Sequence, residues 1–179
     1  MNVYELWIPI LLAGLVTHIL STLFWTVMPH HKPEWKALPN EDDFYRLSSG
    51  KMPPGQYMFP YPANAEACKS EEHKAKTNKG TGMLVIWSGP LNMGKAIGLT
   101  LVSFMVIAFV IGYLASISLS KGADFMIVFR FVTTAGLLAH IAARFPNIFW
   151  FRKKIAMDIV DGIAYAVATG LIFAWLWPK

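Results

Sequence analysis

Four long apolar stretches constrain this chain more than any other feature of its sequence. They occupy residues 6–28, 96–118, 125–143 and 155–177. A run of about 18 or more mostly apolar residues can cross the ~30 Å hydrocarbon core of a bilayer as a helix. Because that core holds no water, every backbone N–H and C=O must be paired within the protein, and a helix does this within one segment. The sequence therefore predicts an all-α membrane protein with a bundle of four transmembrane helices.

The composition agrees with one polytopic membrane domain covering residues 1–179. Hydrophobic residues make up 55% of the chain and charged residues only 15%, whereas soluble domains carry about 25% charged residues. The net charge of +5 is better explained by membrane topology and anionic lipid headgroups than by nucleic acid. We therefore expect the lipid bilayer as a partner and no nucleic acid. Cys68 is the only cysteine, so the chain forms no internal disulfide.

The distribution of Lys and Arg predicts the orientation in the membrane. Basic residues recur through the polar segment 29–95 and in the link between the third and fourth spans, which contains Arg144, Arg152, Lys153 and Lys154. The opposite side has only Lys121 and Lys179. Because Lys and Arg near span ends favour the cytoplasm, we expect both basic segments there and both termini outside. The default location is the plasma (inner) membrane.

The polar segment 29–95 is predicted to be a long, mostly irregular loop, because many prolines interrupt it. Asn40 can cap a short helix over 41–47, and residues 56–59 can pair with 83–87 as a small ribbon. The loop is unusually rich in large apolar groups, which often mark interaction sites. It can act as a cap on the helix bundle or as a docking surface for a protein partner. The candidate docking residues are Tyr57, Met58, Phe59, Tyr61 and Trp87.

Small residues recur at four-residue spacing in the second and fourth spans. Such rows let helix backbones approach closely, which drives helix association in lipid. They can serve packing within one bundle or form the face of a homo- or hetero-oligomer. The spacing does not separate these two interpretations. The candidate packing residues are Gly94, Gly98, Gly112, Gly162, Ala166 and Gly170.

Ionisable residues inside the spans are costly and often functional. Asp158, Asp161 and Tyr165 share one face of the fourth span, by their helical spacing. Depth estimates from the helical rise allow His18 and His140 to converge with Asp161 in the inner half of the bundle. Such a cluster can be a structural clamp between helices, in which Asp158 faces Lys154 or Arg152 near the headgroups, or a site that holds a proton.

Arg130 completes the set of intramembrane polar residues. It lies in the outer half of the third span, from which its long side chain can reach outward to Asp124 or Glu5. Its expected role is thus contact with the outer interface.

A haem or metal site is expected to be absent. Haem ligation by two histidines needs both imidazoles at one level, and the estimated depths of His18 and His140 differ by about 9 Å. Thiolate and imidazole groups suit zinc, but the spacing of the available residues matches no familiar closed site. The weak metal candidates are His30, His31, Cys68 and His73.

The sequence also lacks the common catalytic signatures: a nucleophile elbow, a phosphate-binding loop and an HExxH motif. We therefore expect no enzyme and no cofactor. The favoured hypothesis is a non-catalytic accessory, assembly or scaffold subunit of a membrane complex. The main alternative is a small proton-linked transporter or channel that uses the intramembrane His/Asp cluster. A weaker alternative is a redox subunit that binds haem or metal.

Overall fold

The computed structural model describes residues 1–49, 51–152 and 154–179, and it is mostly helical. Among these residues, four helices are long and apolar enough to cross a membrane. They are Val3–Thr26, Met93–Ser118, Phe125–Phe151 and Ala156–Trp175. The prediction of four apolar spanning helices is therefore confirmed in length and composition.

The first two spans have the expected positions within about a turn. A 3-10 turn, η1 (Val3–Leu6), leads into α1 (Trp7–Thr26), and a second 3-10 segment, η2 (Pro29–Glu34), follows it. The second span is α5 (Met93–Ser118). It begins where the side chain of Asn92 accepts a hydrogen bond from the backbone N–H of Lys95, 2.9 Å away, which satisfies one of the free donors of the first turn.

The third span is longer than its predicted range of 125–143. Helix α6 (Phe125–His140) continues through the 3-10 turn η3 (Ala142–Arg144) into α7 (Phe145–Phe151). Pro146 does not end the helix, because it lies in the first turn of α7, where its missing N–H has no helical partner to lose. The fourth span is α8 (Ala156–Trp175).

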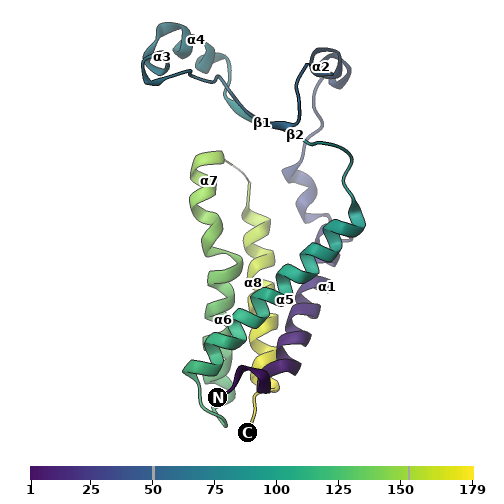
Figure 1. The fold of residues 1–179 in the computed structure, drawn as a ribbon, viewed down its shortest axis with the longest axis vertical. Helices are drawn as coiled ribbons and strands as arrows, with labels where there is room; N and C mark the ends of the chain where they lie inside the picture. Colours follow the sequence, from purple (N-terminus) through teal and green to yellow (C-terminus); the bar gives the residue numbers. More distant parts are fainter. Residues whose placement is uncertain (50, 153) are drawn as a thin grey trace. The chain divides into compact units, whose positions relative to one another are not determined.

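The chain divides into two compact units. We call Met1–Lys36 with Asn92–Lys179 the bundle, and Ala37–Leu91 the insert. Within the bundle, α8 packs against α6 and α1, and α1 packs against α5. Both termini lie at the end of the bundle where α5 connects to α6 (Figure 1). There, the backbone N–H of Gly122 donates to the carbonyl of Pro178 at 2.8 Å.

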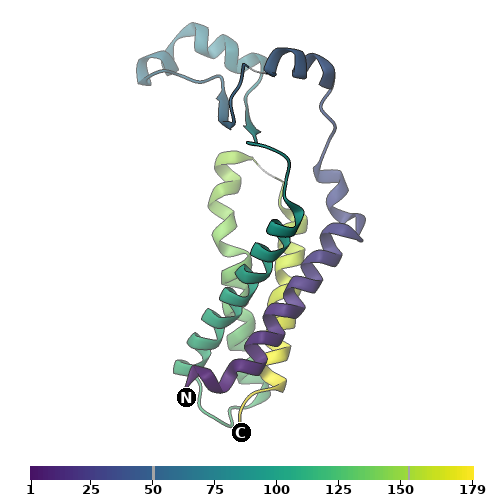
Figure 2. The ribbon, with the colours of Figure 1, turned by 45° about the vertical axis from the view of Figure 1, so that its right-hand side comes forward.

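The bundle has an apolar half and a polar half. The apolar core lies toward the termini, where the start of α1 meets the end of α8 (Figure 2). Its fully buried side chains include Leu6, Val128, Val132 and Phe173. The buried polar side chains His31, His140 and Asp161 lie on segments of the other half. The interior therefore changes from hydrocarbon to ionisable groups along its length.

Small residues bring α6 and α8 together. A Cβ added to Gly136 would lie 2.9 Å from the backbone of Ala166, and one on Gly170 would overlap Thr133. Gly162 faces Ile141 in the same way. These close approaches agree with the predicted packing role of Gly162, Ala166 and Gly170.

In the second span, only one of the three candidate glycines packs against another helix. Gly112 lies against Ile10 and Phe173. The packing prediction for Gly94 and Gly98 is wrong within this chain. A Cβ on Gly98 meets nothing within 4 Å among the described residues, and one on Gly94 meets only Asn92. Both glycines lie in the exposed first turns of α5.

The insert is more regular than predicted. Its strands β1 (Gly55–Phe59) and β2 (Gly82–Ile86) pair antiparallel, with Tyr57 opposite Leu84, which confirms the expected ribbon. The expectation of a mostly irregular loop is wrong, because the prolines of the insert fall between its helices and strands and not within them. The helices of the insert are α2 (Glu41–Ser48), α3 (Ala65–Lys69) and α4 (Glu71–Lys79).

Side-chain caps explain where two of these helices begin. The side chains of Asn64 and Ser70 accept hydrogen bonds from the first turns of α3 and α4. Asn40 precedes α2 as expected, but it adopts a left-handed backbone conformation and makes no side-chain cap.

Candidate functional site

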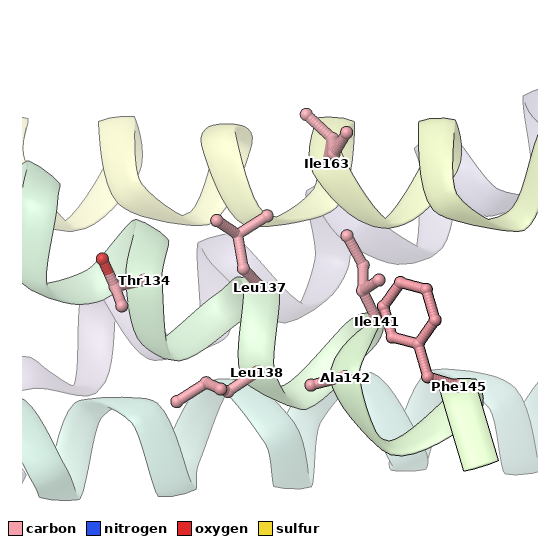
Figure 3. Close-up of a pocket in the computed structure, with 7 residues that line it drawn as sticks. All are labelled: Thr134, Leu137, Leu138, Ile141, Ala142, Phe145 and Ile163. Atoms are coloured by element: carbon pink, nitrogen blue, oxygen red, sulfur yellow. The ribbon is translucent and has the colours of Figure 1, made fainter.

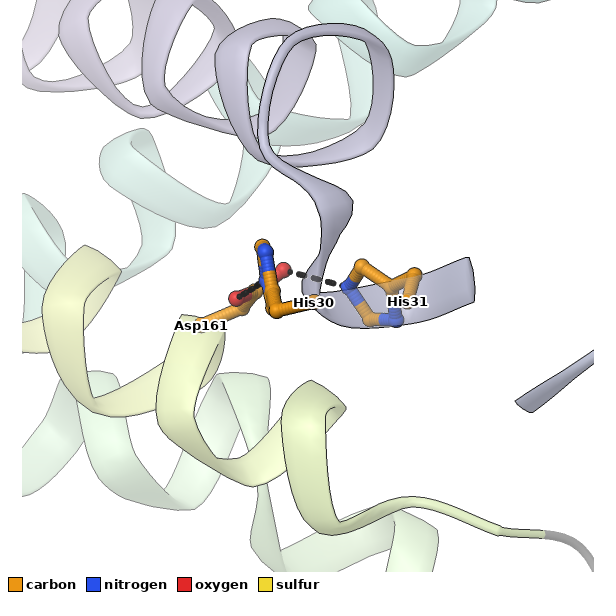
Figure 4. Close-up of side chains that lie close together, drawn as sticks. All are labelled: His30, His31 and Asp161. Atoms are coloured by element: carbon orange, nitrogen blue, oxygen red, sulfur yellow. Dashed lines mark hydrogen bonds and ion pairs between the residues drawn. The ribbon is translucent and has the colours of Figure 1, made fainter. Parts of the chain in front are cut away.

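The most concentrated polar contact in the bundle joins η2 to α8. Two neighbouring histidines of η2 contact the carboxylate of one aspartate of α8 (Figure 4). His30 Nε2 lies 2.9 Å from Asp161 Oδ1, and His31 Nε2 lies 3.0 Å from Asp161 Oδ2. Pro29 opens η2 directly after α1, so the chain turns at the end of the helix and presents both imidazoles to α8. We call His30, His31 and Asp161 the His/Asp cluster.

The cluster satisfies a carboxylate that is almost fully buried. Asp161 is only 3% exposed, and an isolated buried charge would be very costly. Each of its oxygens faces one imidazole, and the hydroxyl of Tyr165 lies 3.4 Å from Oδ2. The predicted proximity of Asp161 and Tyr165 on α8 is therefore present, and the compensating groups come from η2.

His31 lies between two carboxylates. Its Nδ1 is 2.7 Å from Glu34 Oε2, while its Nε2 faces Asp161. Burial of the ring lowers the pKa of His31, but the hydrogen bonds to Asp161 and Glu34 outweigh burial and raise the pKa above its ordinary value. With both nitrogens facing acceptors, the protonated imidazole donates to both.

Aromatic side chains from the end of α1 hold the two imidazoles in place. The indole of Trp25 stacks on His31 with ring centroids 3.9 Å apart, and Phe24 meets His30 edge-on at 5.7 Å. His30 Nδ1 is buried and has no hydrogen-bond partner among the described residues. Both rings are thus oriented by packing as well as by Asp161.

The expected convergence of His18 and His140 with Asp161 is wrong. Both oxygens of Asp161 are already occupied by the histidines of η2. His18 and His140 pack against the ring of Phe104, at centroid distances of 6.4 Å and 6.0 Å. The two imidazoles therefore share an aromatic neighbour, and His140 also packs against the ring of Tyr165 at a centroid distance of 5.6 Å.

Asp158 has a different partner from those expected on its side of the membrane. Its carboxylate pairs with Arg144 at 2.8 Å, across the link between the third and fourth spans. Lys154, one of the expected partners, donates instead to the carbonyl of Pro33 at 3.3 Å. This donation is a second contact between η2 and the start of the fourth span.

Arg130 lies outside the His/Asp cluster. It is exposed and lines an apolar groove along α5 and α6 that also contains Leu114 and Phe131. Glu5, one of its two expected partners, pairs with Lys121. The exposed position of Arg130 follows from its place on the outer face of α6, away from Val128 and Val132 in the core.

A second groove on the bundle has an apolar lining (Figure 3). It lies beside α6, η3 and α8, and Thr134 contributes its one side-chain hydroxyl. Its other lining residues are Leu137, Leu138, Ile141, Ala142, Phe145 and Ile163. Such a lining suits a lipid acyl chain better than a polar substrate.

The weak metal candidates fall in two different units. His30 and His31 belong to the bundle, whereas Cys68 on α3 and His73 on α4 belong to the insert. Cys68 is exposed. The third residue at the histidine pair is Asp161, which the sequence pattern predicts to lie beside His18 and His140 instead. Pro29, which starts η2, is the local sequence feature that indicates a turn of the chain after α1.

The insert presents an apolar surface on one face of its hairpin. Because side chains alternate along a strand, Met58, Met83 and Val85 share one face of the hairpin with Gln56. Trp87 directly follows β2, and we call Met58, Met83, Val85 and Trp87 the hairpin face. All four are exposed, Trp87 by 68% and Met58 by 56%.

This alternation divides the predicted docking residues. Tyr57 and Phe59 point to the opposite face, where the ring of Phe59 covers Gly82. The hydroxyl of Tyr57 donates to the carbonyl of Pro53 at 2.6 Å. Tyr61 follows β1 and is 78% exposed. Met58 and Trp87 are therefore the two predicted docking residues that belong to the hairpin face.

The insert has no buried apolar side chain among its described residues. The one buried residue among them is Ser48, whereas Leu47, Phe59 and Tyr61 are all more than half exposed.

Comparison of the whole chain with protein-family models, with curated proteins and with solved structures finds no significant match.

Proposed function

We propose that this protein is a non-catalytic accessory, assembly or scaffold subunit of a membrane complex, and that its hairpin face binds a partner membrane protein. The observation that carries the proposal is the missing core of the insert. A two-stranded hairpin alone in water is marginally stable and needs packing on one face. A partner that covers Met58, Met83, Val85 and Trp87 would supply this packing.

The chemistry of the hairpin face fits a protein partner. Aromatic residues and methionine are enriched where protein interfaces are fully buried. Methionine adapts its shape to a partner surface, and Met58 and Met83 are directly paired across the strands. The partner surface complementary to this face is apolar, with a pocket for the indole of Trp87.

The proposal includes a location and an orientation. The protein would be a multi-pass protein of the plasma (inner) membrane, with the insert in the cytoplasm and both termini outside. The support is the bias of Lys and Arg toward the insert and toward the link between the third and fourth spans.

The alternative function, proton-linked transport, keeps one specific observation in its favour. His31 and Asp161 are buried and in contact with partly buried His30, and imidazole is the side chain best suited to carry a proton near neutral pH. A transporter would therefore use His30 and His31 in place of His18 and His140. It predicts that His30→Gln abolishes activity while substitutions on the hairpin face are tolerated.

Site-specific photocrosslinking in the native host tests the proposal. A photoreactive amino acid replaces Trp87 or Met58 in the full chain, and irradiated membranes are analysed for adducts. A control position is Tyr45 on α2, which is 54% exposed and outside the hairpin face. We expect one defined protein adduct from positions 87 and 58 and none from position 45.

The lipid and self-packing outcomes are distinguishable in the same experiment. Adducts only to lipid would mean that the membrane surface covers the hairpin face. Adducts only within the chain would mean that the bundle covers it. Either result would contradict the accessory-subunit proposal. Proton-transport assays of the His30→Gln variant would then be the next experiment.

A further inference from the structure

We infer that His30, His31 and Asp161 bind a divalent first-row transition-metal ion, with Zn²⁺ as the best match. This site is independent of partner binding by the hairpin face. It lies in the bundle, where η2 meets α8, at the end opposite the two termini (Figure 1).

The donor atoms are already close enough to share one ion. One ligand atom from each of the three residues lies within 4.8 Å of the other two, and the N–O distances are 2.9 Å and 3.0 Å. Zinc bonds of about 2.0–2.1 Å in tetrahedral geometry separate neighbouring ligand atoms by roughly 3.3 Å. The two N–O distances therefore lie within a few tenths of an ångström of the ligand separations in a zinc site, and the ion would displace the proton from each Nε2 that it binds.

Glu34 supplies the outer contact typical of a metal-bound histidine. Metal-ligating histidines usually donate their second ring N–H to a carboxylate or carbonyl, which fixes the tautomer that presents the other nitrogen to the metal. Glu34 Oε2 lies 2.7 Å from His31 Nδ1, so His31 Nε2 becomes the metal-binding nitrogen. Glu34 is then a positioning residue.

The surroundings favour a rigid site. Trp25 stacks on the ring of His31 at an interplanar angle of 12°, and His31 and Asp161 are only 4% and 3% exposed. Ligands whose rotamers are fixed by packing lose little freedom when a metal binds.

The donor set selects the class of ion. Two imidazoles and one carboxylate suit Zn²⁺ and other first-row transition metals, whereas Mg²⁺ and Ca²⁺ prefer oxygen ligands. Three protein ligands leave a further coordination position for water or another small ligand.

A purely structural clamp predicts the same apo contacts but no metal uptake. The test therefore measures metal binding directly on the full-length chain, purified in detergent with a tag that contains no histidine. After exhaustive dialysis, Zn²⁺ per chain is measured by elemental analysis, and affinity by competition with a chelating dye. Co²⁺ substitution adds a visible spectrum that reports on imidazole and carboxylate ligands.

Four variants define the result: His30→Gln, His31→Gln, Glu34→Gln and the control His73→Gln. We expect wild type and His73→Gln to bind one Zn²⁺ per chain. Glu34→Gln should weaken binding by about 10- to 100-fold, and the two ligand variants should weaken it further. Zn²⁺ should raise the melting temperature of the wild type, because it binds only the folded chain.

The inference is overturned if the wild type takes up no stoichiometric Zn²⁺, or if folded ligand variants bind it as tightly as the wild type does. Gel filtration and thermal melting establish which variants are folded. Should both ligand variants fail to fold, Glu34→Gln decides the question, because it keeps all three ligands. Unchanged zinc affinity in that variant would then contradict the site.

Discussion

The bundle and the insert treat polar and apolar side chains in opposite ways. The bundle buries His31, His140 and Asp161 among its helices, while the insert exposes Met58 and Trp87. In the bundle, each oxygen of the buried carboxylate has a partner from another segment. The apolar side chains of the hairpin face are exposed in the part of the chain that the structure describes. The bundle therefore compensates its buried charge within its own segments, whereas our proposal assigns the cover of the hairpin face to a partner.

The difference also concerns how backbones approach one another. In the bundle, Gly136 and Gly170 let α6 and α8 come into direct backbone contact. In the insert, a Cβ on Gly80 would meet nothing within 4 Å among the described residues, whereas one on Gly82 would overlap the ring of Phe59. Added side-chain volume should therefore be most disruptive between α6 and α8, where backbone meets backbone.

The largest expected effect comes from adding volume between α6 and α8. Gly170→Leu would place a side chain into Thr133 and Phe129, so we expect the variant to lose its folded population. Gly98→Leu adds the same volume on α5, where a Cβ meets nothing within 4 Å, and should stay folded. Monodispersity in detergent and the melting temperature measure both variants. Equal behaviour of the two would mean that the close approach of α6 and α8 does not limit side-chain volume there.

A smaller loss of stability is expected at the His/Asp cluster. Asp161→Asn removes the carboxylate that His30 and His31 share, and breaking a buried pair of this kind costs about 3–5 kcal/mol. Asp158→Asn breaks the pair with Arg144, whose side chain is 53% exposed, so about 1 kcal/mol or less is expected. Thermal melting in metal-free buffer compares the two variants. A larger loss for Asp158→Asn would show that the cluster does not hold η2 on α8.

The hairpin face should tolerate substitution in the purified chain. Replacing both Met58 and Trp87 by serine removes exposed apolar surface, so stability should change by about 0.5 kcal/mol or less. The same variant should no longer retain the partner protein identified by photocrosslinking, when pull-downs from wild-type and variant membranes are compared. Loss of stability without loss of the partner would mean that this face packs inside the protein.

Cys68 allows the orientation to be tested with no effect on stability. It is the only cysteine and it is exposed in the insert. A membrane-impermeant maleimide should label it in inside-out vesicles and leave it unlabelled in spheroplasts. Ser120→Cys in a Cys68→Ser background, on the side of the termini, should give the reverse pattern. Labelling of Cys68 in spheroplasts would contradict the proposed topology, because it would place the insert outside the cytoplasm.

The features that the sequence predicted well are local ones. Four apolar runs determine four spans because hydropathy over about 20 residues needs no knowledge of distant contacts. The pairing of β1 with β2 was foreseen because each strand has β-forming residues next to turn residues. The placement of Met58 and Met83 on one face, and of Phe59 on the other, required the register, which the structure supplies.

The His/Asp cluster was missed because it depends on a distant contact. Helical phase and depth placed Asp161 inside the bundle, but they said nothing of a partner 131 residues earlier in the chain. His30 and His31 had been considered as metal candidates with Cys68 and His73. Only the fold-back of η2 onto α8 brings the histidines to Asp161.

Hydrogen–deuterium exchange on the purified chain tests the central comparison most directly. The account predicts slow exchange for the backbone amides of α6 and α8, and fast exchange for β1 and β2 until a partner is bound. Protection of β1 and β2 in the partner-free chain that matches the bundle would contradict it, because the insert would then possess a core of its own.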